Sequence, residues 1–173
     1  MFPSIAGAIA LIISCGALGF YFAAKEGFRV QELQEFKKAL IILSSEIEHL
    51  RTPLPMASES IARRSNEPVS GLFSEFAVLL KQNEGETAYR LWSQVLERLK
   101  GRSYFAAEDL DVLDGFGKTL GYLDKQMQQS AIAVTVEYID DKTVSLQAQA
   151  EKNRRMYRSL GVIGGLLLVV VLW

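Results

Sequence analysis

The stretch that decides the fold is NRRMYR at residues 153–158, followed by SLGVIGGLLLVVVLW at residues 159–173. Arginine is well solvated in water and poorly solvated in lipid, so the end of charge at Arg158 predicts a membrane boundary. As a helix, the uncharged tail would cover about 22 Å, less than the roughly 30 Å hydrocarbon core. The Tyr157 and Arg158 side chains can snorkel to supply part of the difference. We therefore expect residues 159–173 to form a C-terminal transmembrane helix.

The other end of the chain strengthens this expectation. Residues 1–24 contain no charged side chain, and this stretch is long enough to span a membrane as a helix. A cleaved signal peptide is the alternative, but it would place positive charge before the apolar run and small residues after it. Here residues 1–4 are uncharged, and the run ends in the bulky sequence FYF at residues 20–22. We favour an uncleaved N-terminal transmembrane helix.

Basic residues flank both predicted spans on their inner sides. They are Lys25, Arg29, Lys37 and Lys38 after the first span, and Lys152, Arg154, Arg155 and Arg158 before the second. Positive charge beside a span normally stays in the cytoplasm. The prediction is a cell-membrane protein with residues 25–158 cytoplasmic and both termini across the membrane. All 19 Lys+Arg and all 20 Asp+Glu lie in this middle segment, and the net charge of −1 gives no reason to expect nucleic acid binding.

The middle segment has the pattern of amphipathic helices. Apolar residues recur at alternating spacings of three and four from about residue 29 to 51, namely Leu33, Phe36, Leu40, Leu43, Ile47 and Leu50. Similar patterns predict helices at about 55–64, 68–82, 88–100, 105–120 and 122–158. The sequence VTV at 134–136 favours a strand in isolation, but it lies within helical rows. The predicted fold is all-α: a cytoplasmic bundle of about six helices, anchored by an N-terminal and a C-terminal transmembrane helix. Residues 147–153 are polar and are expected to form a solvated stalk.

The sequence TPLP at residues 52–55 must end the first of these helices. A residue before proline is pushed out of the helical region, and Pro55 suits the first turn of the next helix. The turn has either a structural role or a role as a contact surface. For the second role the candidate partner-binding residues are Glu46, Arg51, Thr52, Pro53 and Leu54. In the C-terminal span, Gly161, Gly164 and Gly165 are candidates for close packing of membrane helices, although glycine is also tolerated there without a partner.

No arrangement typical of catalysis is present in the sequence. The single histidine, His49, and the single cysteine, Cys15, cannot form a zinc site or a disulfide framework. The acidic run from Glu108 to Asp114 is interpreted as a solvated face whose first-turn acids suit the helix dipole. No glycine-rich phosphate loop with a lysine occurs outside the predicted spans. We predict no enzymatic activity, no cofactor and no metal site.

Five features in order resemble the stage III sporulation protein AB family of endospore-forming bacteria. They are the N-terminal membrane helix, EIEHLRTPL at 46–54, PVSGLF at 68–73, FGKTLG at 116–121 with Asp124 and Gln128, and YRSLGVIGG at 157–165. The likeness covers nearly the whole chain. The family is similar to the cytoplasmic helical domains of type II secretion inner-membrane platform proteins. The resemblance implies a place in the channel complex that links mother cell and forespore.

The function expected from this resemblance is that of a membrane platform in a secretion-like channel required for sporulation. The implied location is the mother cell membrane facing the forespore. The implied partners are the cytoplasmic secretion-type ATPase of the same operon, docked by the helical domain, and other membrane components of the channel. The alternative is a membrane-anchored regulatory adaptor unrelated to secretion, which the same topology would serve.

Overall fold

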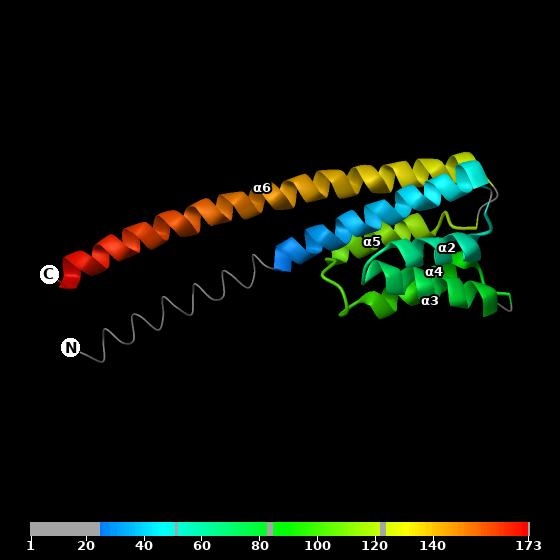
Figure 1. The fold of residues 1–173 in the computed structure, drawn as a ribbon, viewed down its shortest axis with the longest axis horizontal. Helices are drawn as coiled ribbons and strands as arrows, with labels where there is room; N and C mark the ends of the chain where they lie inside the picture. The colour runs from blue at the N-terminus through cyan, green and yellow to red at the C-terminus, as the bar shows by residue number, and fades with distance from the viewer. Residues whose placement is uncertain (1–24, 51, 83–84, 122–123, 173) are drawn as a thin grey trace. The chain divides into compact units, whose positions relative to one another are not determined.

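The computed structural model describes the backbone of residues 25–50, 52–82, 85–121 and 124–172, and the side chains of these residues apart from 49, 50 and 153–172. All regular structure in this part of the chain is helical (Figure 1). A helix at residues 25–45 runs into a π-helical turn, and five α-helices follow: η1 Glu46–Leu50, α2 Leu54–Arg64, α3 Val69–Gln82, α4 Ala88–Leu99, α5 Ala107–Gly117 and α6 Lys125–Leu172. The predicted all-α class and the six predicted helices are confirmed for the described residues.

The predicted membrane anchors are not settled by the fold. The N-terminal span falls on residues 1–24, which lie outside the described residues. Within the described part of the chain, no helix is both long and apolar enough to cross a membrane. The backbone of α6 is helical as far as Leu172, so residues 159–172 continue the helix that begins in the bundle. Both anchors stay predictions.

The chain divides into two compact units. One unit is Phe28–Thr143, the helical bundle, and the other comprises Met1–Gly27 and Val144–Trp173. The division falls inside α6, because only the first part of this helix packs in the bundle. The division predicted from charge, at residues 1–24, 25–158 and 159–173, stays a prediction.

The bundle is built around the indole ring of Trp92 on α4. Its ring centroid lies 5.2 to 6.3 Å from those of its aromatic neighbours Phe36, Phe73, Phe76 and Phe116. Its Nε1 donates to the Leu113 carbonyl oxygen at 2.9 Å, which satisfies the only polar atom of this buried ring. These contacts join the first helix to α3, α4 and α5.

One glycine makes this core possible. A Cβ atom at Gly117 would lie 2.0 Å from Trp92 Cδ1, too close for any side chain. Gly117 thus allows α4 and α5 to approach closely. At Gly115, by contrast, a Cβ would meet nothing within 4 Å.

The helix at residues 25–45 and α6 run antiparallel within the bundle (Figure 1). Lys37 Nζ donates to both carboxylate oxygens of Asp140, at 2.6 and 2.7 Å. Further along, Lys125 Nζ donates to the carbonyl oxygen of Glu48 at 3.3 Å. Consequently the chain enters and leaves the bundle at one end, called the root, near Phe28 and Thr143. The opposite end, called the tip, holds the turn after η1 and the beginning of α6.

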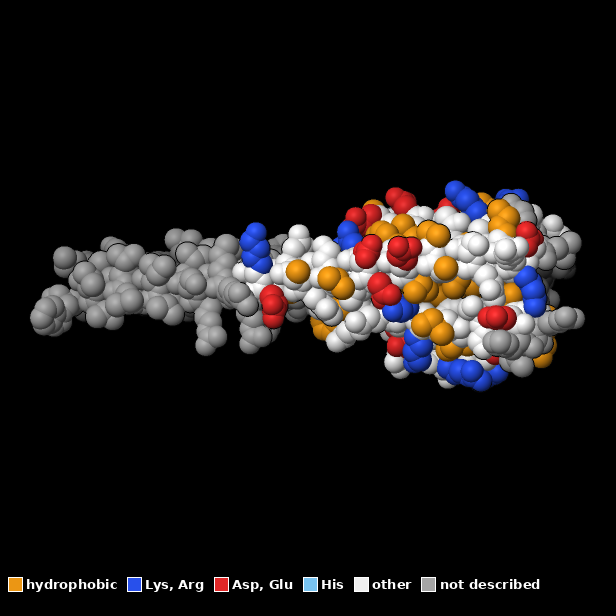
Figure 2. All heavy atoms as spheres, turned by 90° about the horizontal axis from the view of Figure 1, so that it is seen from above, with side chains coloured by type: hydrophobic (Ala, Val, Ile, Leu, Met, Phe, Trp, Pro, Cys, Tyr) orange, Lys and Arg blue, Asp and Glu red, His pale blue; other side chains and the backbone are white. Residues whose placement is uncertain are grey.

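The visible surface of the bundle carries no area of a single charge. Figure 2 shows acidic and basic side chains interspersed over this face, with hydrophobic side chains between them. Nucleic acid binding needs a basic stripe or patch, and the described residues on this face do not provide one.

Candidate functional site

At the tip, the side chain of Glu46 holds the chain reversal together. Its carboxylate is buried and accepts hydrogen bonds from Thr52 Oγ1 at 2.7 Å and from Ser60 Oγ at 3.0 Å. The backbone N–H of Thr52 also donates to the Glu46 carbonyl oxygen at 3.3 Å. We call Glu46, Thr52, Pro53, Leu54 and Ser60 the tip turn. Its bonds join the first helix to α2 across the reversal.

The prolines in this turn start α2 in the expected way. Pro53 precedes the helix with φ −56° and ψ 141°, and its carbonyl oxygen accepts from the N–H groups of Met56 and Ala57 at 2.9 and 3.0 Å. Pro55 occupies the first turn, where a missing N–H costs nothing. Met56, in the first turn of α2, is 57% exposed. Ala57 and Ile61 face the core instead, which turns Met56 toward solvent.

The environment of Glu46 favours its charged form. The hydrogen bond from Thr52 is the main cause that lowers the pKa of Glu46, and the bond from Ser60 and the positive charge of Arg64 act in the same direction, while burial opposes them. A buried carboxylate that accepts two hydroxyl bonds is a structural anchor. Glu46 therefore positions the turn, and its own oxygens are already occupied.

The structure brings most of the predicted partner-binding residues together. Glu46, Thr52, Pro53 and Leu54 share the tip turn, whereas Arg51 lies outside the described residues. Pro53 is exposed and Leu54 is half-buried, so the surface that a partner would meet is mainly apolar. Their role in partner binding stays a prediction. The same holds for Gly161, Gly164 and Gly165, of which only the helical backbone is described.

A second buried carboxylate, Asp109, lies near the root. Its side chain is fully buried and accepts from Arg29 Nε at 2.7 Å, Arg29 Nη2 at 2.8 Å and Tyr138 Oη at 3.0 Å. It also accepts from the backbone N–H of Ala106 at 2.8 Å, which caps the start of α5. Beside it, Glu108 pairs with Arg29 at 2.7 Å and with Lys142 at 2.6 Å.

These five residues form one charged network, which we call the root clamp: Arg29, Glu108, Asp109, Tyr138 and Lys142. The bonds to Asp109 are the main cause that raises the pKa of Arg29, against the effect of burial. Lys142 and then Arg29 lower the pKa of Glu108. Burial, followed by the charge of Asp109, raises the pKa of Tyr138. These shifts keep Arg29 and Glu108 charged and keep Tyr138 a neutral hydrogen-bond donor at neutral pH.

The prediction that Asp109 belongs to a solvated face is wrong. The adjacent acids Glu108, Asp109 and Asp111 look alike in the sequence, and helical periodicity does not identify a buried charge. Asp109 is buried because Arg29, 80 positions earlier, brings a guanidinium group to it. Only the packing of the first helix against α5 creates that pair.

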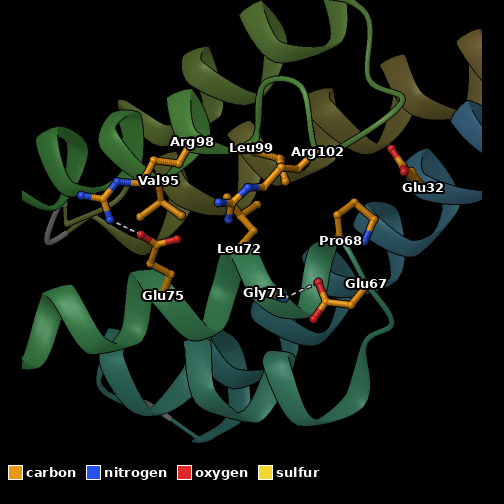
Figure 3. Close-up of a pocket in the computed structure, with 10 residues that line it drawn as sticks. All are labelled: Glu32, Glu67, Pro68, Gly71, Leu72, Glu75, Val95, Arg98, Leu99 and Arg102. Atoms are coloured by element: carbon orange, nitrogen blue, oxygen red, sulfur yellow. Dashed lines mark hydrogen bonds and ion pairs between the residues drawn. The ribbon is translucent and has the colours of Figure 1, made fainter.

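A groove lies between α3 and α4 (Figure 3). It encloses about 320 Å³ over the apolar side chains of Leu72, Val95 and Leu99. An ion pair between Arg98 and Glu75 bridges its two walls.

Gly71 and Glu67 also line this groove. The N–H of Gly71 donates to Glu67 Oε2 at 3.3 Å. A Cβ at Gly71 would lie 2.8 Å from the same oxygen, which ends an exposed and flexible side chain that can move aside. The sequence alone did not predict the groove, because its walls come from two separate helices.

No chemistry is evident in these arrangements. Among the residues that the structure describes, no three His, Cys, Asp or Glu side chains are placed to hold a metal ion. The buried carboxylates at both ends are saturated by hydrogen bonds within the chain.

Comparison with known proteins identifies the family. The profile of the stage III sporulation protein AB family matches residues 4–173. The chain belongs to this family. The stage III sporulation protein AB of Bacillus subtilis strain 168 is 31% identical over 166 residues, which cover 96% of each chain. A solved structure of a stage III sporulation protein AB is also 31% identical and superposes with a TM-score of 0.66, covering 72% of this chain and 98% of that one.

These family matches confirm the resemblance drawn from the sequence, and the relatives are named for a stage of sporulation. In the structure, the FGKTLG sequence at residues 116–121, together with Asp124 and Gln128, contributes to the turn from α5 to α6. Gly121 has a positive φ of 89°, where a side chain would be strained. Asp124 Oδ1 accepts from the N–H of Gln126 at 2.9 Å at the start of α6, and Gln128 Nε2 donates to the Thr119 carbonyl oxygen at 3.4 Å. In this part of the chain, the residues that carry the family resemblance have a structural role in the turn.

Proposed function

We propose that this protein is a non-enzymatic platform in the secretion-like channel between mother cell and forespore, and that its helical bundle docks a cytoplasmic ATPase. It sits in the mother cell membrane that faces the forespore, held there by both ends of the chain. The family and its role in sporulation are the starting point of this proposal. The geometry of the bundle supports the rest.

The observation that carries the proposal is the position of the two ends of the bundle. Both chain connections leave at the root, as the antiparallel pair of the first helix and α6 requires. If both connections lead to membrane spans, the root faces the membrane and the tip faces the cytoplasm. A cytoplasmic partner would then meet the tip turn first.

The tip turn has the properties of a docking surface on a rigid support. Exposed Pro53 and Met56 offer apolar area, and the bonds of Glu46 to Thr52 and Ser60 fix the backbone beneath them. A preorganised turn loses little conformational entropy on binding. This is the surface through which we propose that the ATPase docks.

The length of α6 favours a platform over a loosely tethered adaptor. Its 48 residues run from the tip of the bundle to Leu172 without a break in the helix. A platform needs its bundle held in one orientation to the membrane, for which an unbroken helix is suited, whereas an adaptor needs only a flexible link. A Gly-Ser-Gly-Ser insert after Gln149 would therefore abolish sporulation at normal protein levels. Full sporulation with this insert would favour the adaptor.

Docking is tested by affinity purification of the full chain, solubilised in detergent from sporulating cells. The tagged wild type should retain the ATPase, and Met56→Asp should lose it. Val78→Asp is the matched control, because Val78 on α3 is similarly exposed. Retention of the ATPase by Met56→Asp would move docking away from Met56 and the tip turn beside it. No ATPase with any variant, in cells that need the protein to sporulate, would favour the regulatory adaptor.

The orientation is tested by thiol labelling in intact cells. In a Cys15→Ser background, Gln149→Cys should react with an impermeant reagent only after lysis. Reaction before lysis would place the bundle outside the cytoplasm and contradict the proposal.

A further inference from the structure

Two exposed aromatic rings stack on each other at the root of the bundle. Phe28 begins the bundle, and Tyr104 lies in the connection between α4 and α5. Their ring centroids are 5.0 Å apart, with an angle of 23° between the planes. Even so, Phe28 is 47% exposed and Tyr104 is 41% exposed. The stack therefore covers only part of each ring and leaves a combined aromatic surface open.

The connection that carries Tyr104 is held in place. Glu32 Oε2 accepts from the Tyr104 N–H at 2.6 Å, and the Arg102 N–H donates to the Leu99 carbonyl oxygen at 3.0 Å. Gly101 has a φ of 81°, which lets the chain turn sharply after α4. The stacked ring is thus presented by a fixed backbone, and Phe105 beside it is buried against Phe36.

The connection itself contains basic and aromatic side chains, with Glu97 and Glu32 of neighbouring elements against it. Residues 100–105 have the sequence KGRSYF, with two cations and no acid. Lys100 pairs with Glu97 at 2.5 Å, while Arg102 lines the groove between α3 and α4 (Figure 3). Tyrosine and phenylalanine have an apolar ring to bury, and tyrosine also has a hydroxyl that can stay in water. This combination is enriched at membrane–water interfaces.

The position of Phe28 in the chain indicates which surface is within reach. The predicted first span ends at residue 24, four positions earlier, a rise of about 6 Å along a helix. The headgroup layer on each side of a bilayer is roughly 5 to 7 Å thick. If the span ends at residue 24, Phe28 would lie at the level of the headgroups. Tyr104, 76 positions away in the chain, would lie beside it because the two rings stack.

We infer that Phe28, Tyr104 and the connection at residues 100–104 form a membrane-contact surface that rests on lipid headgroups. This inference rests on the proposed membrane anchoring and deepens it. The surface would fix the tilt of the bundle against the bilayer, because it adds a contact beside the N-terminal span. A platform that must present its tip in one direction gains from such a contact.

The inference is tested with the full-length protein reconstituted in vesicles of phosphatidylcholine and phosphatidylglycerol. Part of the phosphatidylcholine carries a nitroxide quencher on its headgroup. In a Cys15→Ser background, a fluorophore is attached to Arg102→Cys, which leaves both rings in place, or to Met56→Cys at the tip. The label at position 102 should lose most of its fluorescence, and the label at position 56 should keep it.

The rings are tested by removing them. Phe28→Ser with Tyr104→Ser should restore much of the fluorescence at position 102, whereas the exposed control Val78→Ser should leave the quenching unchanged. Unchanged quenching in the ring double variant would overturn the role of the rings.

The remaining outcomes separate the two hypotheses. Protein that floats with the vesicles but shows no quenching at position 102, or equal quenching at both positions, overturns the contact and leaves the anchoring intact. Protein that does not float with the vesicles overturns both.

Discussion

The two ends of the bundle each use a buried carboxylate, but they use it differently. At the tip, Glu46 accepts from hydroxyl groups only 6 and 14 positions away in the chain. At the root, Asp109 accepts from a guanidinium group 80 positions away and a phenol 29 positions away. The tip turn joins consecutive helices, whereas the root clamp joins the first helix, α5 and α6.

The tip turn therefore depends on contacts near in sequence, whereas the root clamp depends on contacts between distant parts of the chain. The tip turn can form as soon as the chain reverses, because its donors are near in sequence. The root clamp exists only after the three helices have packed, and it then carries a buried charge whose loss leaves Arg29 without its main partner. We therefore expect the root clamp to matter more for global stability and the tip turn more for local structure.

Asp109→Asn should have the largest effect. It removes the charge that Arg29 faces and should lower the free energy of unfolding by about 3 kcal/mol. Urea denaturation of the detergent-solubilised protein measures this loss, with Asp111→Asn as the matched control on the exposed side of α5. Equal stability of the two variants would show that the root clamp is no stronger than a surface pair.

Glu46→Ala should lower the free energy of unfolding by less, about 2 kcal/mol. It leaves two hydroxyl donors without an acceptor, but it leaves no opposite charge unpaired at close range. The same denaturation experiment measures it, with the exposed Glu137→Ala as control. Hydrogen exchange should rise at residues 52–57 and stay low around Asp109. A larger loss than that of Asp109→Asn would reverse the comparison between the two ends.

Lowering the pH should test two of the carboxylates whose pKa is lowered. Glu46 and Glu108 have folded pKa values below their usual range, so they stabilise the fold above the unfolded pKa of about 4.3. This stabilisation is lost as the pH falls through the folded pKa values. The stability gap between wild type and Glu46→Ala should therefore shrink as the pH is lowered below about 4. Melting temperatures of both proteins between neutral and acid pH measure the gap, and a constant gap would contradict the assigned shift.

The smallest effect is expected for the exposed ion pair of Lys81 and Glu59, which links α3 to α2 at 2.5 Å. Both side chains are well exposed, so solvent screens their attraction. Glu59→Gln should leave the melting temperature unchanged within error. A clear drop would mean that ion pairs stabilise this bundle wherever they occur, and burial would no longer explain the strength of the root clamp.

The sequence determined the fold class and the helices. Helical periodicity and the prolines at 53, 55 and 68 located the six elements, because a helix needs only a local pattern and a stop signal. The family was predicted from short motifs. In the structure some of these motifs form turns or close helix packing, as at Gly121 and Gly117. The charge boundaries at residues 25 and 158 predicted the anchors, which stay predictions.

Only the tertiary structure decided which polar groups matter. Asp109 is indistinguishable from its acidic neighbours until Arg29 and Tyr138 are brought to it from other helices. Met56 faces solvent because its neighbours Ala57 and Ile61 fill the core, and Tyr104 meets Phe28 because two distant segments share the root. Burial and charge pairing depend on which surfaces meet in space, and a periodic pattern within one helix contains no information about its partner.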